Sequence, residues 1–271
     1  DTSCGIKNNI NNNDNHSNSN NIKMYMCHGK DNITFHTIIL PALLMAMEEN
    51  YHLPDVMVAT QYLNINSEKI SKSKGNGITI KQMVDEYNVD SLRYYMIAYG
   101  PENKDVDFTV ENYINVHNSD IVNKFGNFVN RTLKFKGLDE ILLGIMDTQM
   151  KEKIDETYKE VSEYIESLEF KKACSKIIEL IEMGNKYYDE RKPWIQKREN
   201  IEEFNNTIYT CTNIIANLSN LIEPIMPQTS KRLREYLKIE RPLWKQIQIK
   251  EKISLGNIEI LFERIDINKN R

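Results

Sequence analysis

Cysteine is scarce in this 271-residue sequence, and its four cysteines stand far apart with no Cys-x-x-Cys pair. That spacing excludes a disulfide framework and a zinc knuckle, so we expect no zinc or other metal site in the chain. Reduced thiols are typical of the cytoplasm, which we predict as the location of the protein. The four residues are Cys4, Cys27, Cys174 and Cys211.

Long apolar runs are also absent, because no stretch approaches the roughly 20 apolar residues that span a bilayer. No basic segment followed by an apolar one marks a signal peptide. The net charge of −4 excludes a protein that coats nucleic acid through bulk charge, but is compatible with a local basic patch. With 40% hydrophobic and 27% charged residues, we expect a globular protein with a sizeable core and no membrane partner.

The first 22 residues form a biased tract in which nine residues are asparagine. So few large apolar side chains cannot offset the entropy of ordering, and we predict a disordered segment over residues 1–22. His16 within it is expected to be solvated.

Residues 23–60 alternate between strand and helix patterns. A short apolar run at residues 22–27, a turn at 28–32, an apolar helix at 36–48 with a proline kink and a buried strand at 55–60 make a βαβ pattern. Such a pattern predicts parallel strands, with ligand-binding residues at the carboxyl ends of the strands.

Helical periodicity dominates from about residue 109. Four apolar stripes with steps of three and four residues predict long amphipathic helices in an antiparallel bundle. Cys174 and Cys211 fall on or beside these stripes, so we expect small core residues. Pro224 and Pro227 are expected to end the last long helix, and residues 258–262 to form a short strand or packed extension. The stripes are Ile121, Phe125 and Phe128; Ile154, Tyr158, Val161, Ile165 and Leu168; Phe170, Ala173, Ile177 and Leu180; and Phe204, Ile208, Cys211, Ile215, Leu218 and Ile222.

A lysine- and serine-rich loop at residues 68–77 is the most informative segment. Lysines alternate with serines directly after a strand and before two glycines, a composition that suits a polyphosphate whose charge moves as a bond breaks. The loop is not a Walker A loop, because G-x-x-x-x-G-K-[ST] is absent. A solvated basic surface loop is the alternative.

Residues 69–73 (KISKS) resemble the KMSKS signature of class I aminoacyl-tRNA synthetases, and the surroundings resemble methionyl-tRNA synthetases of the archaeal and eukaryotic cytosolic type. The matches run in family order from about residue 23 to residue 266. They are Gly29-Lys30-Asp31-Asn32 with Phe35-His36, Tyr62-Leu63-Asn64, the signature loop, Leu92-Arg93-Tyr94-Tyr95, Pro101-Glu102 with Asp105, Asp107 and Phe108, Gly126-Asn127-Phe128-Val129-Asn130-Arg131, and Lys192-Pro193-Trp194.

The resemblance implies an aminoacyl-tRNA ligase that joins methionine to ATP, with Mg²⁺, and transfers the methionyl group to initiator and elongator methionine tRNA. It assigns Lys72 and Lys69 to the departing pyrophosphate as catalytic residues. It places Lys30, Asp31, Ser71 and Ser73 at ATP or the adenylate, and Asn32 and His36 in the methionine pocket. A helix-terminal histidine packed on the sheet is the alternative for His36.

The same resemblance assigns three residues to the CAU anticodon: Asn127, Arg131 and Trp194. Asn127 and Arg131 are four residues apart, hence on one helical face and off the core stripe. Trp194, which follows Lys192 and Pro193, completes a trio that suits a single-stranded loop, whose bases splay onto aromatic rings. A core tryptophan and an ordinary surface pair are the alternatives. Local positive charge comes from Lys124, Lys134, Lys136, Lys186, Arg191, Lys197 and Arg198.

The sequence departs from the family ahead of Gly29, where it has no HIGH-type histidine pair and no tryptophan. The family places ATP contacts and part of the methionine pocket there. Since the chain also begins at Asp1, we expect the C-terminal part of a longer synthetase. Without the other half of its catalytic domain, this part is expected not to activate methionine. The sequence identifies no multisynthetase or accessory partner. A non-catalytic tRNA-binding module and a helical scaffold are the competing readings.

The predicted fold class is thus α/β plus all-α. A partial Rossmann-like nucleotide-binding half-domain with the signature loop precedes the antiparallel bundle. The predicted divisions are residues 1–22 (disordered), 23–115 (catalytic half-domain), 116–240 (anticodon-binding bundle) and 241–271 (extension packed on the core).

Overall fold

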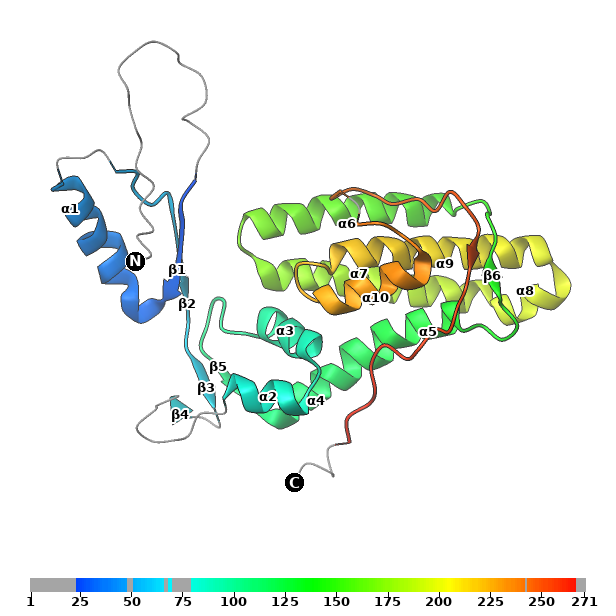
Figure 1. Ribbon diagram of the computed structural model, residues 1–271, viewed down its shortest axis with the longest axis horizontal. Coiled ribbons are helices and arrows are strands. Elements are labelled where there is room, and N and C mark those ends of the chain that lie inside the picture. Colours follow the sequence, from blue (N-terminus) through cyan, green and yellow to red (C-terminus); the bar gives the residue numbers. More distant parts are fainter. Residues whose placement is uncertain (1–22, 48–50, 66–67, 70–78, 242, 267–271) are drawn as a thin grey trace, which may run out of the picture. The chain divides into compact units, whose positions relative to one another are not determined.

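The computed structural model describes residues 23–47, 51–65, 68–69, 79–241 and 243–266 (Figure 1). The chain divides into two compact units, residues 1–69 with 101–107, and residues 70–100 with 108–271. The predicted disordered segment at 1–22 lies outside the described residues, and the predicted domain boundaries stay predictions. Within the described ranges, no helix has the length and apolar content needed to cross a membrane.

The first unit is built on two parallel strands. Strand β1 (Tyr25–Gly29) pairs with β2 (Val56–Thr60) in a register that sets Tyr25 opposite Val56 and Gly29 opposite Thr60. Between them lie a 3₁₀ turn (Lys30–Asn32), the π-helix η3 (Phe35–Ile39) and helix α1 (Leu40–Met45). The predicted parallel pairing is therefore confirmed, although β1 begins later than the expected residues 22–27.

Strand β2 differs from the prediction. It was expected to be buried, yet none of its residues is, and on the predicted apolar helix η3–α1 the side chain of Leu43 is 61% exposed. The described residues of this unit supply too little apolar surface to cover them. Pro41 lies inside a continuous helical run, where the π-helix Phe35–Ile39 passes into α1, and the predicted kink at this proline stays a prediction.

A three-stranded sheet follows, in the order β4-β3-β5. Strand β3 (Leu63–Ile65) pairs antiparallel with β4 (Glu68–Lys69), which sets Asn64 opposite Lys69. The third strand is β5 (Val106–Phe108), where the Val106 N–H donates to the Tyr62 carbonyl oxygen at 3.0 Å. This sheet positions the start of the lysine-rich loop.

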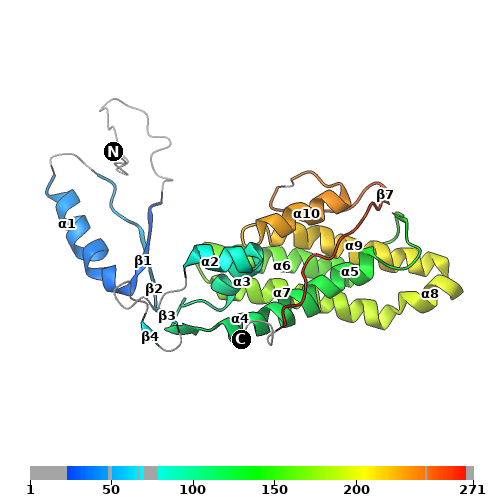
Figure 2. The same cartoon turned by 60° about the horizontal axis from the view of Figure 1, so that its bottom comes forward.

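Helices make up most of the second unit, which Figure 2 shows from another side. A continuous helical run passes from α4 through the π-helix η4 into α5, and a short antiparallel pair of strands, β6 and β7, closes the unit. The elements are α2 (Ile80–Glu86), α3 (Val89–Ala98), α4 (Val110–Val116), η4 (His117–Gly126), α5 (Asn127–Leu133), β6 (Glu140–Ile141), α6 (Thr148–Glu166), α7 (Phe170–Arg191), α8 (Pro193–Glu199), α9 (Ile201–Leu221), α10 (Pro227–Leu237) and β7 (Ile253–Ser254).

The core of this unit follows the apolar stripes of the sequence. Most stripe residues are buried, and Cys174 and Cys211 are 1% and 0% exposed, which confirms them as core residues. The exceptions lie at the turn between α6 and α7, where Leu168 takes a left-handed conformation and Phe170 is 37% exposed. Side-chain caps fix several helix starts, as at Thr79, whose hydroxyl accepts from the Gln82 N–H in a capping box.

The C-terminal region differs most from the prediction. Pro224 follows the end of α9 as expected, but Pro227 opens the additional helix α10, because proline suits the first turn of a helix. Residues 258–262 form no strand. Instead Ile258, Leu261 and Phe262 are buried in the main core, so this segment is a packed extension.

Candidate functional site

The turn after β1 carries the predicted adenylate residues. Lys30 Nζ donates to Asp105 Oδ1 at 2.6 Å and lies 4.2 Å from the centroid of the Tyr62 ring. Asp105 Oδ1 also accepts from the Tyr62 N–H at 2.9 Å. The hydrogen bond from Lys30, helped by that from Tyr62, holds the pKa of the Asp105 carboxyl below its usual value. The lysine is thereby oriented at the carboxyl end of β1, where parallel sheets bind ligands.

Gly29 allows this turn to close. A Cβ added at Gly29 would lie 2.8 Å from Asp31 Oδ1, so a side chain there would displace the Asp31 carboxylate. Asp31 and Asn32 are both exposed, and Asp31 is therefore open to hydroxyl donors of a ligand.

His36 lies in the first turn of η3 and stacks on His28 from the end of β1. Their ring centroids are 4.8 Å apart, with an angle of 22° between the planes. His28 Nδ1 donates to the Gly29 carbonyl oxygen at 3.0 Å. His36 Nδ1 and His28 Nε2 are buried and lack a hydrogen-bond partner among the described residues. The structure thus brings His36 to the same strand end as Lys30 and Asp31.

The signature loop is only partly described. Lys69 ends β4, and its backbone pairs with Asn64. The predicted residues Ser71, Lys72 and Ser73 lie outside the described residues.

The three predicted anticodon residues all belong to the second unit. Asn127 opens α5 and is exposed, Arg131 follows one turn later, and Trp194 lies in the first turn of α8 with 47% of its surface exposed. Tyr188, near the end of α7, lies against both Arg131 and Trp194. The Arg131 guanidinium lies 3.9 Å from the centroid of the Tyr188 ring, and the Trp194 ring lies 6.1 Å from it.

Arg131 is held by an acidic neighbour that sequence reasoning missed. Its guanidinium forms an ion pair with Asp189 and lies within 3.5 Å of the Asn185 side-chain oxygen. The Tyr188 hydroxyl donates to the Arg131 carbonyl oxygen at 2.8 Å, and burial raises the pKa of Tyr188 to about 12. The Arg131 side chain is 20% exposed, so its planar guanidinium reaches solvent at one edge and in a fixed orientation.

The predicted basic patch offers fewer free positive charges than its number of lysines and arginines suggests. Lys124 pairs with Asp120 and Glu182, and Arg191 pairs with Asp147. Lys197 donates to the carbonyl oxygens of residues 136 and 137, at 2.7 and 2.8 Å, and so ties α8 to the loop after α5. These cations support local structure in addition to any phosphate contact.

Among the described residues, no group of three or more His, Cys, Asp or Glu side chains is placed to hold a metal ion.

Comparison with known families accounts for nearly the whole chain. Residues 3–133 match the model described as tRNA synthetases class I (M), and residues 141–265 match the anticodon binding domain of methionyl tRNA ligase. The chain belongs to the class I methionyl-tRNA synthetase family. Its relatives include the methionine–tRNA ligase of Bacillus anthracis (strain CDC 684 / NRRL 3495), which is 40% identical over 253 residues, and that of Bacillus cereus (strain 03BB102), which is 39% identical over 252.

The chain spans about half the length of these curated relatives. The aligned regions cover 91% of this chain and 46% of each relative. These family members are bacterial and give no support to the archaeal and eukaryotic cytosolic subtype, which stays a prediction.

Solved structures of the family have the same fold. Mycobacterium tuberculosis methionyl-tRNA synthetase in complex with methionyl-adenylate superposes with a TM-score of 0.81 at 23% identity, covering 89% of this chain and 50% of that one. Its free form superposes with a TM-score of 0.79. The chain therefore has a class I synthetase fold followed by a helical domain of the anticodon-binding type.

Proposed function

We propose that this chain is the C-terminal portion of a methionine–tRNA ligase, which activates methionine with ATP and Mg²⁺ and charges initiator and elongator methionine tRNA. The observation that carries the proposal is the cluster of Arg131, Tyr188 and Trp194 with exposed Asn127 beside it. An oriented guanidinium and a half-exposed indole are the groups that read and stack splayed bases.

The adenylation side of the proposal uses the turn after β1. Asp31 accepts hydrogen bonds from the ribose hydroxyls, Lys30 is oriented by Asp105 beside the nucleotide, and Asn32 and His36 line the methionine pocket. Lys72, with Lys69, balances the charge that develops on pyrophosphate, and Ser71 and Ser73 supply further donors. Such a loop acts by stabilising the transition state rather than by binding ATP in the ground state.

The finer fold assignment also belongs to this proposal. The parallel pair β1–β2 is assigned to a Rossmann-like half-domain, and the helices within residues 116–240 to an antiparallel bundle. The divisions at residues 23–115, 116–240 and 241–271 follow from that assignment. A cytoplasmic location is proposed separately, from the reduced thiols expected of the widely spaced cysteines.

Two assays test the function. ATP–pyrophosphate exchange is measured on this chain and on a fusion that places the N-terminal half of the Bacillus anthracis relative before it. We expect exchange from the fusion alone. Binding of a hairpin with a CAU anticodon is measured on the chain itself against a hairpin with another anticodon. Tighter CAU binding together with exchange from the fusion supports the ligase, and equal binding of both hairpins contradicts it.

A non-catalytic tRNA-binding module is the alternative, favoured by the chain spanning only about half of its relatives. It predicts CAU-selective binding with no exchange activity in either protein.

A further inference from the structure

The C-terminal segment of residues 243–265, which we call the strap, is held by apolar side chains buried in the core and by hydrogen bonds to its main chain. Asn213, Asn217 and Asn220 occupy successive turns on one face of α9, and all three are at most 2% exposed. Their side-chain amides face the strap, which runs along the helices as the red trace of Figure 1. A carboxamide offers both a donor and an acceptor, so it can pair with a peptide group as another strand would.

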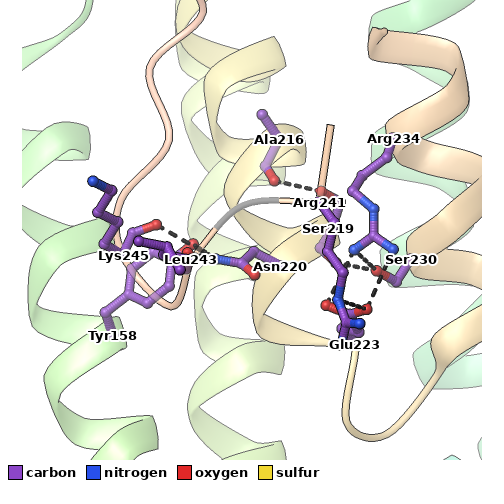
Figure 3. A network of polar contacts seen from close by, with 10 residues as sticks. All are labelled: Tyr158, Ala216, Ser219, Asn220, Glu223, Ser230, Arg234, Arg241, Leu243 and Lys245. Atoms are coloured by element: carbon purple, nitrogen blue, oxygen red, sulfur yellow. Dashed lines mark hydrogen bonds and ion pairs between the residues drawn. The ribbon is translucent and has the colours of Figure 1, made fainter. Parts of the chain in front are cut away.

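Each of these amides takes a defined part of the strap. Asn217 Oδ1 accepts from the Ile247 N–H at 2.7 Å, and its Nδ2 donates to the Ile247 carbonyl oxygen at 2.8 Å. Asn213 Oδ1 accepts from the Ile249 N–H at 2.9 Å. Asn220 Nδ2 donates to the carbonyl oxygens of residues 243 and 245, at 3.1 and 3.4 Å (Figure 3). This row of amides fixes the register of the first half of the strap.

The second half of the strap contacts the chain on both sides of α5, the helix that carries Asn127 and Arg131. Before α5, Phe262 packs on Phe125 with 6.3 Å between ring centroids, and its ring would meet a Cβ at Gly126 at 3.8 Å. After α5, β7 pairs with β6, and the Leu255 N–H donates to the carbonyl oxygen of residue 139 at 2.9 Å.

The far end of the strap is pinned to η4. Asn118 pairs with both backbone groups of Ile265, at 2.9 and 3.0 Å, and His117 Nε2 donates to the Glu263 carbonyl oxygen at 2.8 Å. The strap is therefore anchored on α9 at one end and on η4 at the other, with α5 bracketed between its contacts.

We infer that the strap is a positioning element for anticodon recognition, and that the amide row Asn213, Asn217 and Asn220 sets the register in which it holds α5. The inference rests on the proposed function, because α5 matters to it as the bearer of Asn127 and Arg131. A strap shifted along α9 would move Phe262 and β7 together, and with them both ends of α5. The amide row acts on RNA only through α5.

The test measures RNA binding and strap protection on the same chain. Asn217→Leu removes the paired amide while keeping side-chain size. The matched control is Asn205→Leu, on the same helix and outside the strap contacts of the described residues. Affinities for a CAU hairpin and for one with another anticodon are measured at fixed salt. Hydrogen exchange is followed at the amides of residues 247 and 249.

We expect Asn217→Leu to speed exchange at both amides and to weaken CAU binding by about fivefold or more, which corresponds to a displaced base contact. Binding of the other hairpin and the control variant should stay unchanged. Faster exchange with unaltered CAU selectivity overturns the inference and leaves the proposed function intact. A wild-type chain that does not distinguish the hairpins overturns the proposed function itself.

Should Asn217→Leu fail to fold, Asn118→Ala tests the other anchor in the same way. Loss of CAU selectivity with a folded core supports the inference, and retained selectivity with a released end at residue 265 contradicts it.

Discussion

Arg131 and Tyr188 hold each other in two ways. The Arg131 guanidinium lies 3.9 Å from the centroid of the Tyr188 ring, and the Tyr188 hydroxyl donates to the Arg131 carbonyl oxygen at 2.8 Å. Helices α5 and α7 are thus joined at the position where the guanidinium meets solvent. Because the Arg131 side chain is already ordered in the free protein, less of its conformational entropy is lost when RNA binds.

Replacing this arginine with lysine should therefore be costly for recognition. Arg131→Lys keeps the charge but loses the planar fork and the stacking on Tyr188, so CAU hairpin affinity should fall about 10-fold, the order expected for a lost bidentate base contact. Fluorescence anisotropy at fixed salt measures this. Lys186→Met, on the exposed face of α7, is the control and should weaken both hairpins alike. Equal effects of the two variants on selectivity would count against a reading role for Arg131.

Trp194 should contribute through stacking. Trp194→Ala is expected to weaken CAU hairpin binding by about 1–3 kcal/mol, the usual value for one stacked base. Ile195→Ala removes an exposed side chain at the next position and should have little effect. In the fusion with the Bacillus half, Trp194→Ala should lower tRNA charging and spare pyrophosphate exchange. An equal loss of both activities would contradict an anticodon role.

Lys72 tests the signature loop. In the same fusion, Lys72→Ala should slow pyrophosphate exchange about 100-fold or more, because one donor to the transition-state charge is lost. Lys81→Ala on α2 serves as the control and should leave the rate near that of the parent. An unchanged rate in Lys72→Ala would remove this lysine from the catalytic step.

Gly184 should resist substitution for steric reasons. A Cβ at Gly184 would lie 2.6 Å from Phe128 Cζ, in the middle of the core, whereas one at Gly256 would meet nothing within 4 Å. Gly184→Ala should therefore lower the free energy of unfolding by about 1–3 kcal/mol, the usual result of overpacking, despite the better helix propensity of alanine. Gly256→Ala should be close to neutral. Urea unfolding of the two variants tests this prediction. Equal midpoints would show that the ring of Phe128 can move aside.

His117 should make the strap sensitive to acid. Its Nε2 donates to the Glu263 carbonyl oxygen, its Nδ1 lies 2.6 Å from the Ser91 hydroxyl, and burial lowers its pKa from the ordinary 6.5, against the opposing effect of the Glu263 bond. The unfolded chain then binds the proton more readily than the folded one, so the free energy of unfolding falls as pH drops below about 6.5. His117→Gln should show a smaller fall between pH 7 and 5 in urea titrations. Identical pH profiles would exclude this histidine as the cause.

The periodicity of apolar residues predicted the long helices and the side chains that they bury. The stripes containing Phe125, Ile177 and Ile215 mark the helices correctly, because core burial recurs every three to four residues. Exposure of Leu43 on α1 could not be read this way, since an apolar stripe does not reveal whether a partner is present to cover it.

The sequence did not predict contacts between residues that are far apart along the chain. Asp189 stands 58 positions from Arg131, and no pattern connects an acidic residue on one helix to a cation on another. The amides that hold the strap were missed for a related reason. Asparagine buried against a main chain leaves no apolar signal, and Asn213 looks in the sequence like any polar helix residue.

Recognition of the strap through its peptide groups has an evolutionary consequence. Side chains such as Gln248 and Lys250 are exposed while the backbone beside them is bound. Substitutions at these outward positions leave every anchoring bond in place. Related chains are thus free to diversify this strip of surface while the path of the strap stays constant.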